Sequence, residues 1–192
     1  MSMSISRDSS THLASSADEP ADEEPLERLI LTIVEEDGDW SGFGSLAEAI
    51  QQAAAALARH RHLQSARGRE ASVVLGSDTL LRRLNKTYRD KDAPTNVLSF
   101  PYQPPPGTAS DDGVYLGDVV LAAETLRHEV ADRGIEPRHH LQHLVVHGLL
   151  HLLGYDHQTD AEAGEMESVE TKVLGALGVA DPHADPLSSS SS

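Results

Sequence analysis

The sequence of 192 residues predicts a single α+β domain, with a mixed, roughly four-stranded sheet packed against about five helices. Two observations support this fold class. Short runs rich in apolar and β-branched residues alternate with stretches whose apolar residues recur at helical spacing, in the order βαβαββααα. In addition, 39% of the residues are hydrophobic, so a chain of this length can bury the core of one domain.

The first half of the domain is expected to form two strand–helix units. Residues 28–34 (RLILTIV) predict a strand, and residues 45–60 predict an alanine-rich helix that begins with the capping box SLAE. Residues 71–75 (ASVVL) predict the second strand, and Ser77 or Asp78 then caps a second helix. The apolar residues of that helix fall on one face: Leu80, Leu81, Leu84 and Tyr88.

The second half predicts two more strands and then three helices. The strands are residues 96–100 (NVLSF) and 116–122 (LGDVVLA), with a loop rich in Pro, Gly and Asp at 103–113 between them. The helices cover residues 123–133, 137–153 and about 160–177. Glycine, proline and a threonine capping box mark where these helices begin or end: Gly134, Pro137, Gly154 and Thr159.

The two ends of the chain differ in composition from its centre. Residues 1–26 are rich in Ser, Asp, Glu, Ala and Pro, and residues 181–192 end in a serine run. Such segments cannot bury enough apolar surface to fold. We therefore expect a disordered acidic N-terminal tail, a folded domain at residues 27–180 and a disordered Ser-rich C-terminal tail.

The net charge of −16 is distributed unevenly. Residues 1–27 carry one basic and seven acidic groups, as do residues 158–192, so each segment contributes −6. Residues 28–157 carry thirteen basic and seventeen acidic groups, which leaves −4 for the centre. The centre also holds a basic cluster: Arg82, Arg83, Lys86, Arg89 and Lys91. A polyanion could use this cluster, but a solvated helix face has the same pattern, so charge alone leaves the partner open.

The chain contains no cysteine, which excludes disulfides, thiolate metal sites and cysteine nucleophiles. A site for a soft metal would therefore have to be built from histidine. The first sixteen residues lack the apolar core of a signal peptide, and no stretch approaches the 18 uncharged apolar residues of a membrane span. We expect a soluble, cytoplasmic protein.

Three histidines near the end of the chain have the spacing of a site for one metal ion. His147 and His151 are four residues apart on an expected helix, so both rings leave the same face. Gly154 can end the helix and turn the chain, which lets His157 approach from outside. His143 extends the row, but it lies about 12 Å along the axis from His151, so one ion cannot bind both. Three imidazoles and an open position are typical of catalytic zinc.

The same spacing is found in metzincin proteases, where the residue after the first histidine is the glutamate that acts as general base. Here that residue is Gly148. The site can hold and polarise water, but it lacks this carboxylate, and nothing in the sequence places Glu124 or Glu129 there. A zinc metalloprotease therefore remains an alternative function rather than the expected one.

Three segments together resemble the YbeY-like bacterial rRNA maturation factors. They are residues 147–157 (HGLLHLLGYDH), 84–101 (LNKTYRDKDAPTNVLSFP) and 116–120 (LGDVV), and the resemblance extends over about residues 28–178. It implies a zinc-dependent, single-strand-specific endoribonuclease that acts in 16S rRNA 3′-end maturation and ribosome quality control. The implied partners are single-stranded RNA, in particular the 16S rRNA precursor, and the small ribosomal subunit or an associated protein.

The resemblance also implies roles for individual residues. His147, His151 and His157 would bind one zinc ion, and Arg89 would be the catalytic arginine. A guanidinium suits this role because RNA cleavage passes through a phosphorane with extra negative charge. We expect Lys91 to bind backbone phosphate, and we leave open whether water or the ribose 2′-hydroxyl attacks.

Other polar residues near these segments are expected to support the site. His143 and Asp156 would neighbour the metal ligands, and Asp92 and Asp118 would serve turns or the surroundings of the ligands. Ser99 is expected to bond backbone rather than substrate. A third possible function is a non-catalytic ribosome-assembly factor whose metal is structural.

Overall fold

The computed structural model describes residues 29–60, 63, 66, 68–104 and 115–184. The secondary-structure elements follow the predicted order and confirm the α+β class. They are β1 (Ile30–Glu35), α1 (Leu46–Arg59), β2 (Glu70–Gly76), α2 (Asp78–Arg89), β3 (Val97–Pro101), β4 (Tyr115–Ala122), α3 (Ala123–Arg133), α4 (Pro137–Leu152) and α5 (Asp160–Gly175).

The four strands form one mixed sheet in the order β1-β2-β4-β3. Strands β1, β2 and β4 are parallel, so Val73 of β2 lies beside Val119 of β4. Strand β3 runs antiparallel to β4 and forms one edge of the sheet, with Val97 opposite Leu121. The mixed sheet agrees with the prediction.

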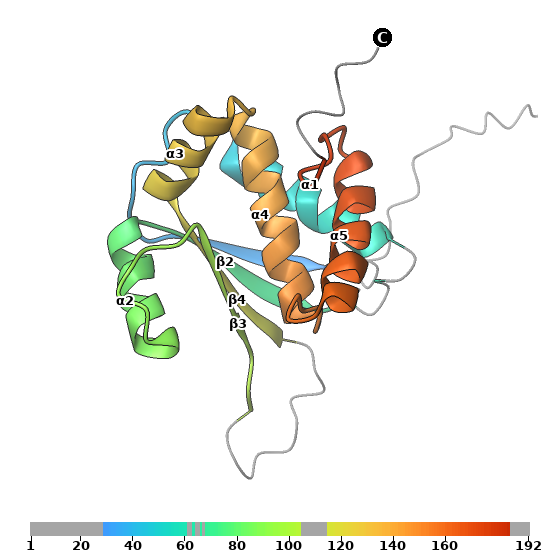
Figure 1. The fold of residues 1–192 in the computed structure, drawn as a ribbon, viewed down its shortest axis with the longest axis horizontal. Helices are drawn as coiled ribbons and strands as arrows, with labels where there is room; N and C mark the ends of the chain where they lie inside the picture. The colour runs from blue at the N-terminus through green and yellow to red at the C-terminus, as the bar shows by residue number, and fades with distance from the viewer. Residues whose placement is uncertain (1–28, 61–62, 64–65, 67, 105–114, 185–192) are drawn as a thin grey trace, which may run out of the picture.

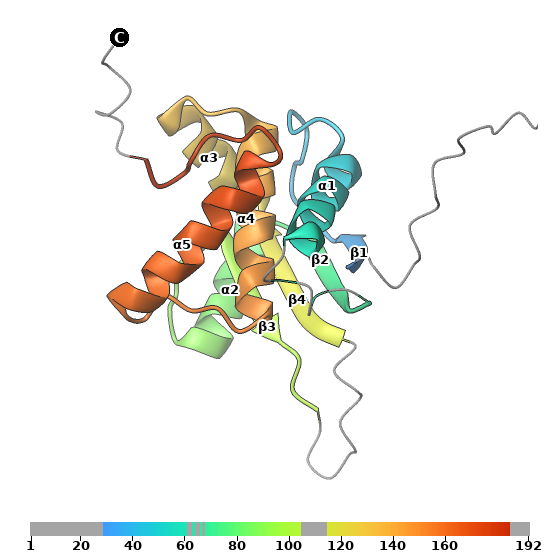
Figure 2. The same ribbon diagram turned by 90° about the vertical axis from the view of Figure 1, so that its right-hand side faces the viewer.

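Helices cover the two faces of the sheet unequally. Helices α1, α4 and α5 lie on one face, and α2 lies on the other (Figures 1 and 2). Side chains alternate between the faces along each strand. Val119 therefore joins the large core under α1, α4 and α5, whereas Val120 joins a smaller cluster under α2 with Leu81 and Leu98.

One predicted helix cap is wrong. Ser45 precedes α1 as expected, but its side chain accepts no capping hydrogen bond. Glu48 does not reach back to Ser45, because its carboxylate accepts a charge-assisted hydrogen bond from Arg138 at the start of α4, at 2.9 Å. The predicted box at the start of α5 does form, with Thr159 and Glu162 bonded to each other's backbone N–H.

Most of the two predicted tails and most of the predicted loop lie outside the described residues, at 1–28, 185–192 and 105–114. Residues 181–184, which composition assigned to the C-terminal tail, are described and contact α5. Thr171 of α5 donates a hydrogen bond to Asp181 at 3.0 Å. Among the described helices, none is long and apolar enough to cross a membrane.

Candidate metal centre

Helix α4 holds two of the three predicted ligands in a fixed position. Most of its residues are buried against the sheet, α1 and α5, whereas His147 and His151 lie on its half-exposed side. The helix ends at Leu152, and Gly154 takes a positive φ of 92°. The chain therefore turns back at this point and brings His157 toward the other two rings.

The three imidazoles converge on one point. The Nε2 atoms of His147 and His151 are 3.1 Å apart. The ring of His157 lies 5.9 Å from that of His147 and 5.0 Å from that of His151, measured between centroids. One nitrogen from each ring lies within 4.8 Å of the others. Two nitrogens bound to one tetrahedral zinc at about 2.0–2.1 Å are about 3.3 Å apart, so the arrangement fits a metal.

The hydrogen bonds of the first two rings leave their Nε2 atoms free to bind a cation. Nδ1 of His151 donates to the backbone carbonyl of Tyr155 at 3.0 Å, and Nδ1 of His147 donates to Glu170 Oε1 at 3.1 Å. Burial and the neighbouring His147 lower the pKa of His151, which favours its neutral form. With Nδ1 as the donor in each ring, the two Nε2 lone pairs point at each other and repel. A cation bound between the two Nε2 atoms would remove this repulsion.

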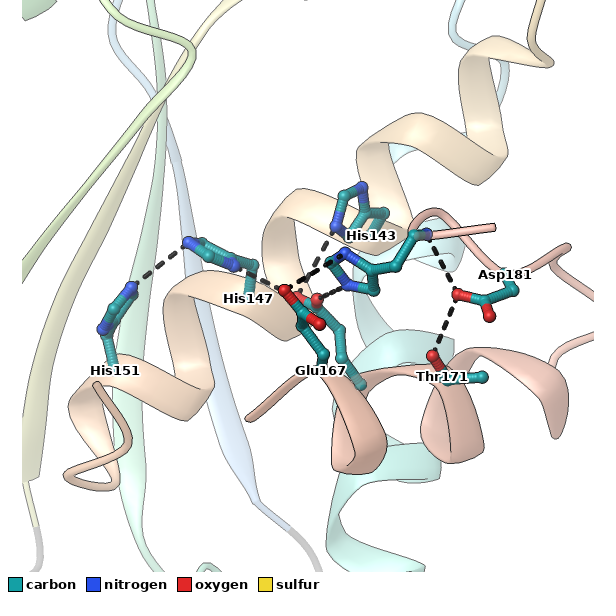
Figure 3. A network of polar contacts seen from close by, with 8 residues as sticks. His143, His147, His151, Glu167, Thr171 and Asp181 are labelled. Carbon is teal, nitrogen blue, oxygen red and sulfur yellow. Dashed lines mark hydrogen bonds and ion pairs between the residues drawn. The ribbon is translucent and has the colours of Figure 1, made fainter. Parts of the chain in front are cut away.

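Glu170 is a buried carboxylate that the sequence analysis missed. Its side chain is 1% exposed and accepts hydrogen bonds from His147 and from His183, whose Nε2 lies 2.6 Å from Oε2. His143 Nε2 lies 3.5 Å from Oε1. Burial raises the pKa of Glu170, but the hydrogen bonds and charges of His143 and His147 outweigh it, so the net pKa is lowered. The network runs from α4 to residues 181–183 (Figure 3).

His143, His147 and Glu170 form a second group with the spacing of metal ligands. Its distances are 3.1 Å from Glu170 Oε1 to His147 Nδ1 and 3.5 Å to His143 Nε2, which suit hydrogen bonds as well as metal ligands. The other oxygen of Glu170 lies 2.6 Å from His183 Nε2, which is a hydrogen bond, so this carboxylate already serves as an acceptor. We therefore assign Glu170 to the orientation of His147. His143 lies beside this carboxylate and outside the three-histidine group.

Gly148 lies where α4 contacts the sheet most closely. A Cβ atom at this position would lie 2.5 Å from Val119 Cγ1 and 3.2 Å from Ser99 Oγ. Ser99 donates a hydrogen bond to the Gly148 carbonyl at 3.1 Å, which confirms the predicted backbone bond of this serine. The space that the glutamate of metzincins would need is thus occupied by Val119 of β4 and Ser99 of β3, and a larger side chain would have to displace them.

The two glutamates considered as substitutes are engaged elsewhere. Glu124 accepts a hydrogen bond from the backbone of Asp78 at 2.8 Å. Glu129 bonds His140 at 2.6 Å and Asn96 at 3.0 Å. Neither carboxylate contacts the three-histidine group, so neither supplies a general base of the metzincin kind.

Arg89 and Lys91 lie at the end of α2, on the other face of the sheet from α4. Neither side chain makes a hydrogen bond or ion pair with the described residues, and the backbone N–H of Lys91 donates to the Asn85 carbonyl of α2 at 3.3 Å. Arg82 and Lys86 of the same cluster both pair with Asp92, and their hydrogen bonds lower its pKa to about 2. The C-terminal ends of α2 and α4 nevertheless lie toward the same end of the molecule (Figure 1).

Two of the predicted aspartates bond residues close to them in the chain, one in a turn and one within a strand. Asp156 accepts a hydrogen bond from the backbone N–H of His157 at 2.8 Å and so holds the turn that carries the third histidine. Asp118 accepts one from the hydroxyl of Tyr115 at 2.7 Å, on the face of the sheet that carries α2.

Comparison with known proteins assigns this chain to a family. The family model described as Endoribonuclease YbeY matches residues 39–178. The chain belongs to the endoribonuclease YbeY family. The endoribonuclease YbeY of Parvibaculum lavamentivorans is 46% identical over 162 residues, which cover 81% of this chain and 85% of that protein. That of Azorhizobium caulinodans is 48% identical over 156 residues, 80% of this chain and 95% of that protein.

A solved structure gives a weaker likeness. The solution structure of TM1509 from Thermotoga maritima is 21% identical to this chain, with a TM-score of 0.45. The superposition covers 81% of this chain and 100% of TM1509. Membership of the YbeY family makes the chain an endoribonuclease, a hydrolase acting on RNA. It favours the nuclease over the metalloprotease and over the non-catalytic assembly factor.

The YbeY match contains the three histidines, Glu170 and Arg89, but it ends before His183. The sequence held a signal for Glu170, because this acidic residue lies in the apolar stripe of α5 with Met166 and Val173. It held none for His183, which lies in a segment of tail-like composition.

Proposed function

We propose that the chain is a zinc-dependent endoribonuclease that cuts single-stranded RNA, with one zinc ion bound by His147, His151 and His157. The observation that carries the metal assignment is the 3.1 Å approach of the Nε2 atoms of His147 and His151, two rings whose Nδ1 atoms both donate hydrogen bonds to oxygen. The family assignment supplies the substrate class. The described residues belong to one catalytic domain, proposed at 27–180.

The residues of the chain prepare this site for phosphodiester cleavage. A bound zinc ion supplies Lewis-acid chemistry, which suits attack by either water or a ribose 2′-hydroxyl. Glu170 and the Tyr155 carbonyl hold two ligand rings in the correct tautomer. We propose that Arg89, which has no carboxylate partner among the described residues, stabilises the negative charge that develops on the phosphate, and that Lys91 holds a neighbouring phosphate.

The substrate that we propose is the 3′ end of the 16S rRNA precursor, with a role in ribosome quality control in the cytoplasm. The sequence resemblance described above supports this substrate. The net charge of −16 opposes the approach of a polyanion, so we propose that RNA binding depends on a partner. A surface of the small ribosomal subunit, or a protein bound to it, would supply the missing contacts.

Metal content and cleavage test the proposed site together. The purified protein should contain one transition-metal ion per chain and should shorten single-stranded RNA but not an unstructured polypeptide. His147→Ala should lose both metal and cleavage. A chelator titration followed by circular dichroism and RNA cleavage separates catalysis from structure. The proposal fails if cleavage survives in His147→Ala, or if the protein as purified holds no stoichiometric metal.

The role of Arg89 needs a matched control on the same helix. Arg83 is also exposed and makes no side-chain bond with the described residues. Arg89→Ala should lower kcat about 10²- to 10³-fold, the typical loss for one group that stabilises a transition-state oxyanion. Arg83→Ala should change it less than about threefold, as expected for a solvated surface charge. Equal losses in both variants would reduce Arg89 to a general electrostatic contribution.

A further inference from the structure

Four of the seven aromatic residues in the chain gather on the face of the sheet that carries α2. Tyr88 of α2 packs edge-on against Phe100 of β3, with ring centroids 5.2 Å apart. Tyr102 packs in the same way against Tyr115, at 5.7 Å. The Tyr115 hydroxyl bonds Ser72 and Asp118, which point to this face. The two pairs therefore lie on the side of the sheet opposite to α4.

A groove of about 600 Å³ lies between α2 and this face of the sheet. Val74 and Val120 form its floor, and Tyr88 and Phe100 form part of its wall. Tyr88 is 67% exposed and Tyr102 is 42% exposed. Among the described residues these are the exposed aromatic side chains, and both are in this region. A hollow of this size with exposed aromatic faces can hold a flat ring by stacking.

The charges around the groove select a base rather than a phosphate for its interior. Glu36 and Asp118 line the groove, and their carboxylates repel phosphate but accept hydrogen bonds from the amino groups of bases. Arg89 follows Tyr88 directly at the end of α2, and Lys91 comes two residues later. Neither cation is neutralised by the described residues, so both are available to a phosphate backbone outside the groove.

We propose that this groove binds nucleobases of the RNA substrate, which stack on Tyr88 in the groove and on Tyr102 beside it while the backbone lies along Arg89 and Lys91. The inference rests on the proposed function and adds a substrate-binding site to it. Strand β3 is the edge of the sheet between the groove and α4, so a bound strand crosses this edge to reach the histidines. Only unpaired bases can turn into the groove, which gives single-strand specificity a physical basis.

Binding to RNA with and without bases tests the groove directly. The probe is a fluorescent 2′-O-methyl oligonucleotide, which has no 2′-hydroxyl to attack the backbone and whose length is checked on a gel after binding, together with a version of the same length whose central residues are abasic. The wild-type protein should bind the abasic probe more weakly. Tyr88→Ala should bind the intact probe about 5- to 100-fold more weakly, the range for one lost stacking partner, and the abasic probe unchanged. Tyr88→Phe keeps the ring and should bind both probes like the wild type.

The matched control is Ile135→Ala, which removes an apolar side chain that is 37% exposed between α3 and α4. It should bind both probes normally. In cleavage assays, Tyr88→Ala should raise KM more than it lowers kcat, whereas a general structural defect would also lower the melting temperature. Equal binding of the intact probe by Tyr88→Ala and the wild type overturns this inference alone. A wild-type protein that neither binds nor cuts RNA overturns the proposed function as well.

Discussion

Glu170 shows how one buried residue connects the metal centre to the rest of the fold. A carboxylate that is 1% exposed would be strongly unfavourable without partners, because burial removes its hydration. Here His147 and His183 donate to its two oxygens. The charge therefore fixes the ring of a proposed metal ligand and also holds the segment that follows α5.

Replacing this carboxylate with an amide should weaken metal binding. In Glu170→Gln the neutral side chain still fits, but it holds the Nδ1–H of His147 less strongly and makes its Nε2 less basic. Metal affinity should fall about 10- to 100-fold, as is typical when the partner of a ligating histidine is lost. Competition with a chromophoric chelator measures the change. Glu165→Gln, on the exposed side of α5, is the control and should keep the wild-type affinity.

At the scale of elements, α4 connects the sheet to the metal centre, and its distance from the sheet is set by a glycine. Gly148 allows the helix to approach Val119 and Ser99 closely. Since His147 immediately precedes this contact, any shift of the helix would move a proposed ligand. The close approach and the ligand geometry are therefore coupled.

A methyl group at position 148 should disturb both the packing of α4 on the sheet and the position of His147. Gly148→Ala places Cβ 2.5 Å from Val119 Cγ1, and the overpacking should lower the free energy of unfolding by about 1–3 kcal/mol. Gly164→Ala is the matched control, because α5 leaves its Cβ position open and alanine favours a helix by up to about 1 kcal/mol. Urea denaturation measures both. A Gly148→Ala protein as stable as the wild type would contradict the close contact.

A second connection between elements depends on pH. Glu129 of α3 bonds His140 of α4 and Asn96 before β3. Although burial raises its pKa, these bonds lower it overall. The stability it provides is therefore complete above the unfolded pKa of about 4.3 and is lost as the pH falls through the lower folded value. At pH 7 the free energy of unfolding of the wild type should be about 1–3 kcal/mol higher than that of Glu129→Gln.

The same comparison at lower pH tests the sign. The difference in free energy of unfolding between the wild type and Glu129→Gln should shrink as the pH falls from 5 toward 3, where the carboxylate takes up a proton. Urea denaturation at several pH values measures this difference. A difference that grows on acidification would contradict the lowered pKa of Glu129.

The elements of this fold could be predicted from the sequence because each depends on a local pattern. Hydrophobic periodicity identified every strand and helix in order, and Thr159 predicted the cap of α5. The features that were missed depend on residues far apart in the chain. The Ser45 cap is not formed because Arg138 binds Glu48, and Glu170 meets its histidines only after α4 and α5 have packed together. The spacing of the histidines is local, so it predicted a group that the structure brings together.

At the scale of the whole molecule, the acidity of the chain opposes its RNA substrate. Of the net charge of −16, residues 1–27 contribute −6. Arg89 and Lys91 are two cations beside the groove whose side chains have no partner among the described residues. They are few beside the net negative charge, so repulsion from the rest of the chain weighs strongly against RNA binding. Such repulsion acts over distance and is weakened by salt.

Removal of residues 1–27 should therefore strengthen RNA binding in a salt-dependent way, because it changes the net charge from −16 to −10. Affinity for single-stranded RNA should rise at an ionic strength of about 0.01 M, where charges interact over about 30 Å, and should match the full chain near 1 M. Fluorescence anisotropy measures both. A full-length variant with the seven acidic residues changed to Asn or Gln should behave like the truncation. If it binds like the wild type, the effect of the segment is not electrostatic.

The turn after α4 has a consequence for how quickly the site exchanges its ion. His147 and His151 belong to a helix that is packed on several sides, whereas His157 is exposed on a turn held by Gly154 and Asp156. Two of the proposed ligands are thus held by packing, whereas the third could swing away through rotation of a few backbone bonds. An ion would arrive at the helical pair first and leave after His157 had released it. The lifetime of a bound ion would then be governed by a surface turn, although its affinity would be governed by the buried helix.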